Sequence, residues 1–441
     1  AVPIPNEFDG VVRQEEEKAI ITWQTFNIGK DAAVRFDQKG HGDWSVLNRI
    51  HDIDPSQILG RLKADGKVFL INQNGILFGQ DARVNVHSLV ASSLDISFDD
   101  FLGDRLRFRA QSESAGAVSN HGLIRTNTAG SVFLLGPEVE NFGTVEVPGG
   151  QIGLVAGDEV ELSTLEAESR LFPFVYVTPG ENGLVTNSEG GHLIADAGIG
   201  GLYGRVVNQE GVIRCVTAIS NKGRIELHAS EKVATGAGSR TLVPISDDSE
   251  KVHKSFQVKG GEIHVGGLDE RVLVQKVFRN KTSAARRIEH YGDLSAPSGI
   301  IAMDAKERVY LEKGSMIDTA GEWVKRSWDS QIVSVQLNSM ELKNDYGQAG
   351  GILQGETVEV NPYEGSSIGD ISGALNYDFL TAREMSTKGG AIKISAISGD
   401  IIAREGAEIN FSGGGTSYFG GTIDTTRLVS TAGKIHDIQD A

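Results

Sequence analysis

The chain has 441 residues, of which 55 are Gly and only 10 are Pro, and its formal net charge is −17. Abundant Gly beside 39% hydrophobic residues suits many tight corners between short strands and argues against a disordered linker. The acidic charge argues against nucleic acid as a partner, because phosphates need a basic surface, and equally against an anionic membrane surface.

A single cysteine, Cys215, excludes an intrachain disulfide. It stands in the apolar stretch Val212–Val216, which predicts a buried and inert thiol. No run of about 18 apolar residues occurs, so we expect no membrane-spanning helix. We also recognise no signal-peptide pattern within the given residues.

In chain order, residues 1–19 are polar, and two strands are expected at Ala19–Trp23 and Ala33–Phe36. The stretch Lys67–Ile71 is apolar after its first residue and predicts a buried strand. Asn72–Gly75 then predicts a corner, because Asn and Gly tolerate left-handed backbone angles, and Ile76–Phe78 resumes a strand. Asn-Gly is also typical of a hairpin turn, but the surrounding sequence argues against a hairpin.

That surrounding sequence is a set of blocks in a fixed order, most of them short strand candidates with Asn or Gly nearby. The blocks are Trp23–Gly29, Val46–Ile50, Pro55–Gly60, Ala82–Val86 and Leu89–Ile96. Together with Asn72-Gln73-Asn74-Gly75-Ile76 they resemble the N-terminal secretion domain of two-partner secretion exoproteins, the filamentous haemagglutinin family. The family hallmark is N-P-N-G-I after a strand, and Gln73 stands here in the proline position. A second family motif, N-P-N-L, is absent, although Asn27 lies in a comparable early region.

The resemblance implies a right-handed parallel β-helix with an N-terminal cap, and passage of the unfolded chain through an outer-membrane barrel of the Omp85 type. It would also make Ala1-Val2-Pro3 a mature N-terminus left after cleavage. We expect the recognition and nucleation segment at the residues that match or lie near the family motifs. These are Asn72, Asn74, Gly75, Ile76, Asn48 and Asn27. The alternative is that the asparagines only bond corner carbonyls and hold the turn rigid; both can be true.

From Gly116 the sequence becomes repetitive. Asn120–Ile124 and Asn141–Val145 lie 21 residues apart, and Asn208–Ile213 and Asn221–Ile225 echo them. A second unit, Gly-Gly followed by a strand, recurs at residues 149–152, 260–263, 350–353 and 389–392. Weak repeats of about 20 residues that hold short strands indicate a solenoid.

The clearest turn of that solenoid lies near the end of the chain. Three short strands are expected at Ala391–Ala396, Asp400–Ala403 and Ala407–Phe411, separated by Gly. Apolar and polar residues alternate in the first, so that one face points inward. This pattern predicts a triangular parallel β-helix. The alternative, a β-sandwich, would favour recurring Asn-Gly hairpin turns instead.

Residues 228–345 break the pattern. A locally basic patch predicts either an insertion that contacts a partner or, as we prefer, a solvated loop on the rod. Its cations are Arg271, Lys276, Arg279, Lys281, Arg286 and Arg287. A short helix is expected at Thr282–His290, because Ala and Arg are good helix formers. Residues 363–388 resemble a loop, 412–421 a turn region and 435–438 one more strand.

We therefore expect an all-β fold, a right-handed parallel β-helix with an N-terminal cap and an extra-helical insertion. Residues 1–230 would form the secretion domain with the cap and first coils. Residues 231–345 would form an irregular insertion with some coils, and residues 346–441 would continue the β-helix.

No enzymatic activity is expected. Parallel β-helices include polysaccharide hydrolases, whose motifs have partial counterparts at Gly40–Gly42, Arg61–Lys63 and Asp99-Asp100. Their order is wrong, and we can name no pair of acids that would face each other across a glycosidic bond. No metal-ligand spacing or phosphate-binding loop is found, so no cofactor is expected.

The expected function is that of a secreted exoprotein at the cell surface of a Gram-negative bacterium, acting as an adhesin or surface fibre. Its expected partners are the Omp85-type transporter during export and a host or cell-surface receptor. The alternative is a structural subunit that self-associates head to tail into an extracellular filament, because unpaired strand edges accept another chain.

Overall fold

The computed structural model describes residues 10–111, 115–163, 174–219, 221–247, 250–253, 258, 260–274, 277–282, 284–338, 340–342, 350–377, 379–420 and 424–440. The predicted mature N-terminus, Ala1-Val2-Pro3, lies outside these residues. The chain divides into two compact units. The β-helix unit comprises Ala1–Ile245, Gly260–Thr319 and Gly390–Phe411, and the second unit comprises Ser246–Lys259, Ala320–Gly389 and Ser412–Ala441.

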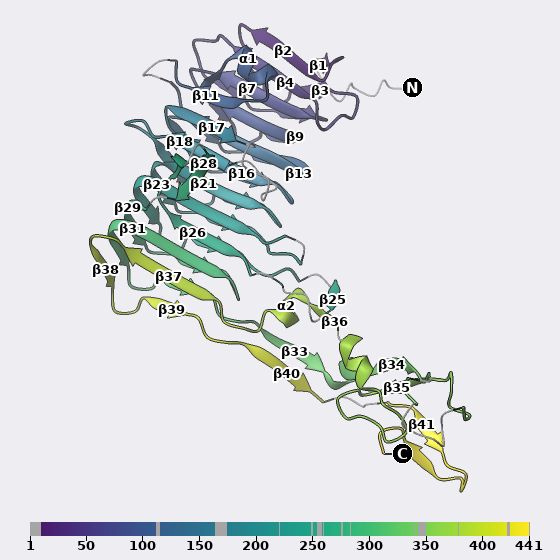
Figure 1. The fold of residues 1–441 in the computed structure, drawn as a ribbon. Helices are drawn as coiled ribbons and strands as arrows, with labels where there is room; N and C mark the ends of the chain where they lie inside the picture. The colour runs from purple at the N-terminus through teal and green to yellow at the C-terminus, as the bar shows by residue number, and fades with distance from the viewer. Residues whose placement is uncertain are drawn as a thin grey trace. The chain divides into compact units, whose positions relative to one another are not determined.

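Most of the β-helix unit is a stack of short strands in three columns, and each strand of these columns pairs in parallel with strands of neighbouring turns (Figure 1). The first column consists of β2 (Lys18–Trp23), β4 (Ser45–Ile50), β7 (Lys67–Asn72), β9 (Arg83–Ser92), β13 (Leu123–Gly136), β16 (Gln151–Ala156), β21 (Ile199–Gln209), β23 (Arg224–Thr235), β26 (Glu262–Gly266), β31 (Ile300–Leu311) and β37 (Ala391–Ala396). Among the longer strands, β21, β23 and β31 continue past a corner into the second column, whereas β9 and β13 begin in the third.

The second column contains the corner-following strands and the later parts of β21, β23 and β31. Its other members are β5 (Ser56–Ile58), β8 (Ile76–Phe78), β12 (Val118–Asn120), β14 (Glu138–Asn141), β19 (Leu184–Asn187), β29 (Ala285–His290) and β38 (Asp400–Ala403).

The third column contains the first parts of β9 and β13. Its other members are β1 (Gly10–Arg13), β3 (Ala33–Asp37), β6 (Arg61–Ala64), β15 (Thr144–Glu146), β20 (His192–Ile194), β22 (Val212–Arg214), β24 (Arg240–Leu242), β30 (Asp293–Ser295), β32 (Met316–Asp318) and β39 (Glu408–Asn410). Three short strands per turn confirm the predicted parallel β-helix. The predicted turn near the end of the chain is confirmed as β37, β38 and β39.

A continuous apolar core fills the interior of the stack, because every second side chain of a strand points inward. Val68 and Leu70 of β7 belong to this core. Their neighbours Phe69 and Ile71 face outward and pack into a second apolar cluster. The apolar run of β7 is therefore buried on both faces, as in other parallel sheets that are covered on both sides.

A ladder of buried amides runs along the second column. Asn120, Asn141, Asn187 and Gln209 occupy the same position in successive turns and are fully buried. The side-chain amide of each of the first three donates to the next side-chain oxygen at 2.8 Å. The 21-residue repeat of Asn120 and Asn141 is thus a spatial repeat. In the later echo the rung is Gln209 rather than Asn208.

An antiparallel sheet that the sequence did not reveal covers part of the stack. It consists of β10 (Asp95–Ile96), β11 (Leu106–Arg109), β17 (Glu159–Ser163) and β18 (Phe174–Thr178), with the short helix α1 (Phe98–Leu102) after β10. Its side chains pack on outward residues of the first column, including Phe69 and Phe133. The outward apolar residues of β7 were the available signal for such a cover.

The helix predicted at Thr282–His290 is wrong. Residues 285–290 form the strand β29, which pairs in parallel with β23 and β31. Ala285, Ile288 and His290 are fully buried in the stack, and this burial with ladder hydrogen bonds outweighs the helix propensity of the segment. Just before it, β27 (Asp269–Val274) and β28 (Val277–Thr282) form an antiparallel hairpin outside the three columns.

The expected division of the chain also differs from the structure. The boundary after residue 230 falls inside β23, and the stack continues from β23 to β32 through the segment expected to be irregular. Of residues 346–441, only 390–411 belong to the β-helix unit.

The second unit has its own small core, formed by Leu337, Leu342, Val358, Val360, Ile371 and Ile438. Its parallel pair is β33 (Trp323–Ser327) with β40 (Gly415–Phe419), and its antiparallel pairs are β34 (Val333–Gln336) with β35 (Thr357–Val360), β25 (Lys251–His253) with β36 (Phe379–Thr381), and β41 (Arg427–Val429) with β42 (Ile435–Asp437). Short helical turns occur at Trp328–Gln331, Ser372–Tyr377 and Ala382–Met385 (η2, η3 and α2).

Three predictions fall on this unit. The strand expected near residues 435–438 is confirmed as β42, although it belongs to an antiparallel pair rather than to a coil. The turn region expected at 412–421 is wrong, since it contains β40. The loop expected at 363–388 contains η3, β36 and α2.

Candidate functional site

The segment around Asn72 is a corner of the β-helix and not a hairpin. The strands on either side, β7 and β8, do not pair with each other. β7 pairs in parallel with β4 and β9, and β8 pairs in parallel with β5 and β12. The corner therefore directs the chain from the first column into the second.

The side chain of Asn72 is fully buried at this corner and fastens it to the preceding turn. Its amide nitrogen donates to the carbonyl of Asp54 at 3.0 Å and to the Ser56 hydroxyl at 2.9 Å. Its side-chain oxygen accepts the backbone N–H of Asn74 at 3.0 Å. Removing this side chain would break all three bonds and leave the buried Ser56 hydroxyl without its amide partner, which is costly.

Asn74 makes a similar bond from an exposed position. Its side-chain amide donates to the carbonyl of Asp52 at 2.7 Å. Asn72 and Asn74 together hold the preceding loop, residues 52–56, against the corner. Sequence reasoning missed this loop as part of the site. The local sequence of a turn does not show which residues of the neighbouring turn lie beside it.

Gly75 and Ile76 connect the corner to the following turn. Gly75 has φ +107°, and a Cβ there would lie 2.6 Å from the carbonyl oxygen of Ala117, so only glycine fits. The backbone N–H of Ile76 donates to the same carbonyl at 3.1 Å, and the Ile76 side chain is buried in the core. The motif thus contacts the turns on both sides of it.

The other two candidate residues also join neighbouring turns. Asn48 is fully buried in β4; it accepts the indole N–H of Trp23 at 2.9 Å and donates to the carbonyl of Phe69 at 3.2 Å. The side-chain oxygen of Asn27 accepts the backbone N–H of Gln57 at 2.7 Å. The structure does not gather these two with Asn72 into one cluster; each fastens a different pair of strands.

The outer surface of the corner combines polar and apolar groups. Asn74 is exposed, and Ile53 in the loop that Asn72 and Asn74 hold is 85% exposed. Within the described residues, no group of three or more His, Cys, Asp or Glu side chains could hold a metal ion. The corner can therefore position the backbone of two turns and present a small surface.

Comparison with known proteins shows the family of the part of the chain that contains this corner. Residues 7–242, more than half of the chain, match the family profile of the TPS secretion domain. The chain belongs to this family. Residues 7–242 are the secretion domain of an exoprotein of a two-partner secretion system, and such exoproteins are secreted out of Gram-negative cells. The family resemblance predicted from the sequence is confirmed.

The TPS secretion domain also has curated relatives and a structural counterpart. It is similar to two heme/hemopexin-binding proteins of Haemophilus influenzae, with 39% and 36% identity over 85 residues. Each match covers 19% of this chain and only 9% of the relative. It is also similar to the crystal structure of the HMW1 secretion domain from Haemophilus influenzae, with 24% identity and a TM-score of 0.48, covering 71% of this chain and 91% of that one.

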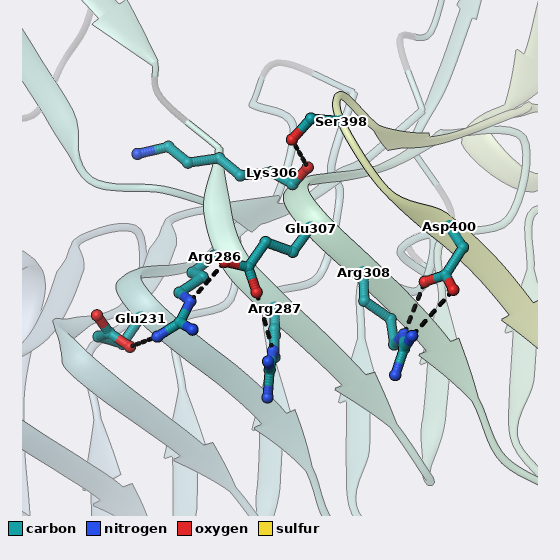
Figure 2. Close-up of polar contacts among 8 residues, drawn as sticks. All are labelled: Glu231, Arg286, Arg287, Lys306, Glu307, Arg308, Ser398 and Asp400. Carbon is teal, nitrogen blue, oxygen red and sulfur yellow. Dashed lines mark hydrogen bonds and ion pairs between the residues drawn. The ribbon is translucent and has the colours of Figure 1, made fainter.

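The basic patch predicted after the TPS match is partly neutralised by its neighbours. Arg286 contacts Glu231 at 3.1 Å and Glu307 at 2.7 Å, and Arg287 contacts Glu307 at 3.2 Å. Figure 2 shows these pairs, together with the two-bond pair of Arg308 and Asp400, crossing successive turns of the stack. Such half-exposed pairs each stabilise little. Lys276 lies outside the described residues, as do the side chains of Arg271, Arg279 and Lys281.

The residues weighed for other chemistry have structural contacts. His41 stacks on Trp44 with ring centroids 4.4 Å apart, and Asp100 accepts from Arg105 at 2.8 Å. Cys215 is fully buried in the apolar core, and burial raises the pKa of its thiol. None of the helices in the part of the chain that the structure describes has the length and apolar character to cross a membrane.

Proposed function

We propose that this TPS secretion domain engages an outer-membrane transporter of the Omp85 type and that the exported chain acts at the cell surface as an adhesin or surface fibre. The observation that supports the export step is the corner at Asn72–Ile76. It matches the family motif and makes hydrogen bonds to the turns before and after it.

These contacts suit folding that follows emergence from the transporter. The loop at residues 52–56 precedes Asn72 in the chain, so it would leave the barrel first. Asn72 and Asn74 would then dock onto a turn that is already outside. Each turn of a solenoid contacts mainly its neighbours, so a stack can grow one turn at a time and oppose backsliding.

The proposed role outside the cell is binding rather than catalysis. The similarity to heme/hemopexin-binding proteins, although it covers 19% of the chain, supports a role in capturing an external molecule. The partial hydrolase motifs lie on three different elements: His41 before β4, Arg61 in β6 and Asp99 in α1.

A second candidate function is assembly into a filament. The last turn of the β-helix unit, β37–β39, pairs on one side only in the described part of the chain. Ile401 and Ile409 of this turn are 50% and 43% exposed. An unpaired parallel edge with exposed apolar residues is a template for another turn.

Export, adhesion and filament assembly can be tested with one set of strains. The chain, preceded by a secretory signal, is produced with and without its cognate transporter, and the amounts in medium and periplasm are compared. The export proposal expects release only with the transporter. The adhesive role expects increased cell attachment of transporter-positive bacteria, whereas purified chains that sediment as long filaments would favour the second candidate.

A further inference from the structure

One face of the β33–β40 pair in the second unit carries exposed aromatic rings. In the parallel register Trp323 lies opposite Gly415, Lys325 opposite Ser417, and Ser327 opposite Phe419. Because side chains alternate along strands, these residues share one face. Trp323 is 70% exposed and Phe419 is 53% exposed.

The indole of Trp323 lies flat on this face. A Cβ at Gly415 would be 3.0 Å from Cζ3 and 3.3 Å from Cη2 of the indole. The missing side chain of Gly415 thus lets one side of the ring rest on the sheet while the other side faces solvent. Phe419 stands at the opposite end of the pair, about 13 Å away along the strands at ~3.3 Å per residue.

Lys325 lies between the two rings and is exposed. In the described part of the chain no carboxylate lies within ion-pair distance of its ammonium group. The neighbouring cations are different, since Arg326 contacts Glu384 at 3.1 Å and Arg383 contacts Glu322 at 3.0 Å. Lys325 is therefore a free cation in an acidic protein of net charge −17.

We propose that this face binds a carboxylated oligosaccharide. A sugar ring has faces of C–H groups, which pack on the electron-rich face of an aromatic ring, and an edge of hydroxyl groups. Trp323 and Phe419 offer two such surfaces with the Ser417 hydroxyl between them. Lys325 supplies the opposite charge for a carboxylate, which distinguishes an acidic sugar from a neutral one. The inference rests on the proposed adhesive role, for which it names the receptor class.

The test is titration of the purified full chain with sialyllactose and, separately, trigalacturonate, followed by calorimetry and tryptophan fluorescence. Lactose is the neutral control. These two acids represent animal and plant sources of the same chemistry. We expect binding of at least one acid, with lactose at least about tenfold weaker.

The variants separate recognition from folding. Trp323→Ala and Phe419→Ala should each weaken binding about tenfold, and Lys325→Gln should remove most of the preference for the acid over lactose. Trp328→Ala is the matched control, because Trp328 stacks on Tyr418, which lies on the opposite face. Lys313→Gln, an exposed cation of the β-helix unit, controls for charge.

The proposal is overturned if neither acid binds, if lactose binds as tightly as the acids, or if Trp328→Ala weakens binding as much as Trp323→Ala. Circular dichroism of each variant establishes that it is folded, and Lys325→Gln tests the proposal without altering the aromatic rings. Because the assay uses no transporter, a negative result leaves the export proposal intact.

Discussion

The side-chain amide of Asn74 donates to the main-chain carbonyl of Asp52 at 2.7 Å and so joins two successive turns of the β-helix from an exposed position. Its neighbour Asn72 makes the same kind of junction from a fully buried position. We therefore expect the two asparagines of this motif to contribute different amounts to the free energy of unfolding.

The first prediction follows from that difference. Asn72→Ala should lower the free energy of unfolding by about 3 kcal/mol, because it removes three hydrogen bonds, to Asp54, Ser56 and Asn74, and leaves the buried Ser56 hydroxyl without this partner. Asn74→Ala should lower it by about 1 kcal/mol, because water can replace an exposed bond. Urea denaturation monitored by circular dichroism measures both. Equal losses would show that burial does not control the strength of these junctions.

The second prediction concerns the buried amide ladder. Asn141→Ala removes the bonds to Asn120 and Asn187 and should cost about 3 kcal/mol. The matched control is Asn208→Ala, since Asn208 lies half-buried beside the Gln209 rung and outside the ladder; it should change stability by less than about 0.5 kcal/mol. If both variants melt alike, the ladder is not a source of stability.

Sequence reasoning worked where the pattern was local. The apolar run Lys67–Ile71 followed by Asn-x-Asn-Gly is enough to predict a strand and a corner. The alternation of apolar and polar residues in Ala391–Ala396 is enough to predict which face points inward. Neither depends on knowing the partner strand.

It failed where a distant partner decides the outcome. Residues 285–290 have a helix-forming composition, but β23 and β31 on either side make them a strand. In the antiparallel sheet that covers the stack, β11 pairs with β17, which lies about 50 residues further along the chain. No local sequence pattern predicts that pairing. The partners of Asn72 in the 52–56 loop could not be predicted either, because they lie in the preceding turn of the stack.

The third prediction is a loss of stability on acidification. The Nε2–H of His290 donates to the Met316 carbonyl at 3.0 Å, which leaves Nδ1 to accept the Thr235 hydroxyl at 2.7 Å. Burial lowers the pKa of His290 from its ordinary value near 6.5. The unfolded chain therefore takes up a proton at higher pH than the folded chain does, so this stability is present above about pH 6.5 and is lost as pH falls below it.

Urea melts at several pH values between 5 and 8 check this directly, with roughly constant ionic strength. His290→Gln should flatten the decline below pH 6.5 relative to the native protein, whereas His192→Gln, at an exposed position, should leave it unchanged. An identical decline in His290→Gln would assign the acid sensitivity to other groups.

The fourth prediction uses Cys215 as a reporter of folding. Its thiol is fully buried, and its raised pKa keeps it protonated, so the folded protein should resist alkylation by iodoacetamide for hours. In urea the same cysteine should react at the rate of a free thiol. Mass spectrometry after timed quenching gives both rates. Rapid labelling of the native protein would mean that this part of the stack opens readily.

The most direct test of the account is export of Asn74→Ala with the cognate transporter. The amount released into the medium is compared with that of the native chain and of Asn208→Ala, and each purified protein is examined for folding. We predict reduced release of Asn74→Ala and normal release of Asn208→Ala. Normal release of a folded Asn74→Ala protein would contradict it and would leave the Asn74–Asp52 bond a structural detail of the corner.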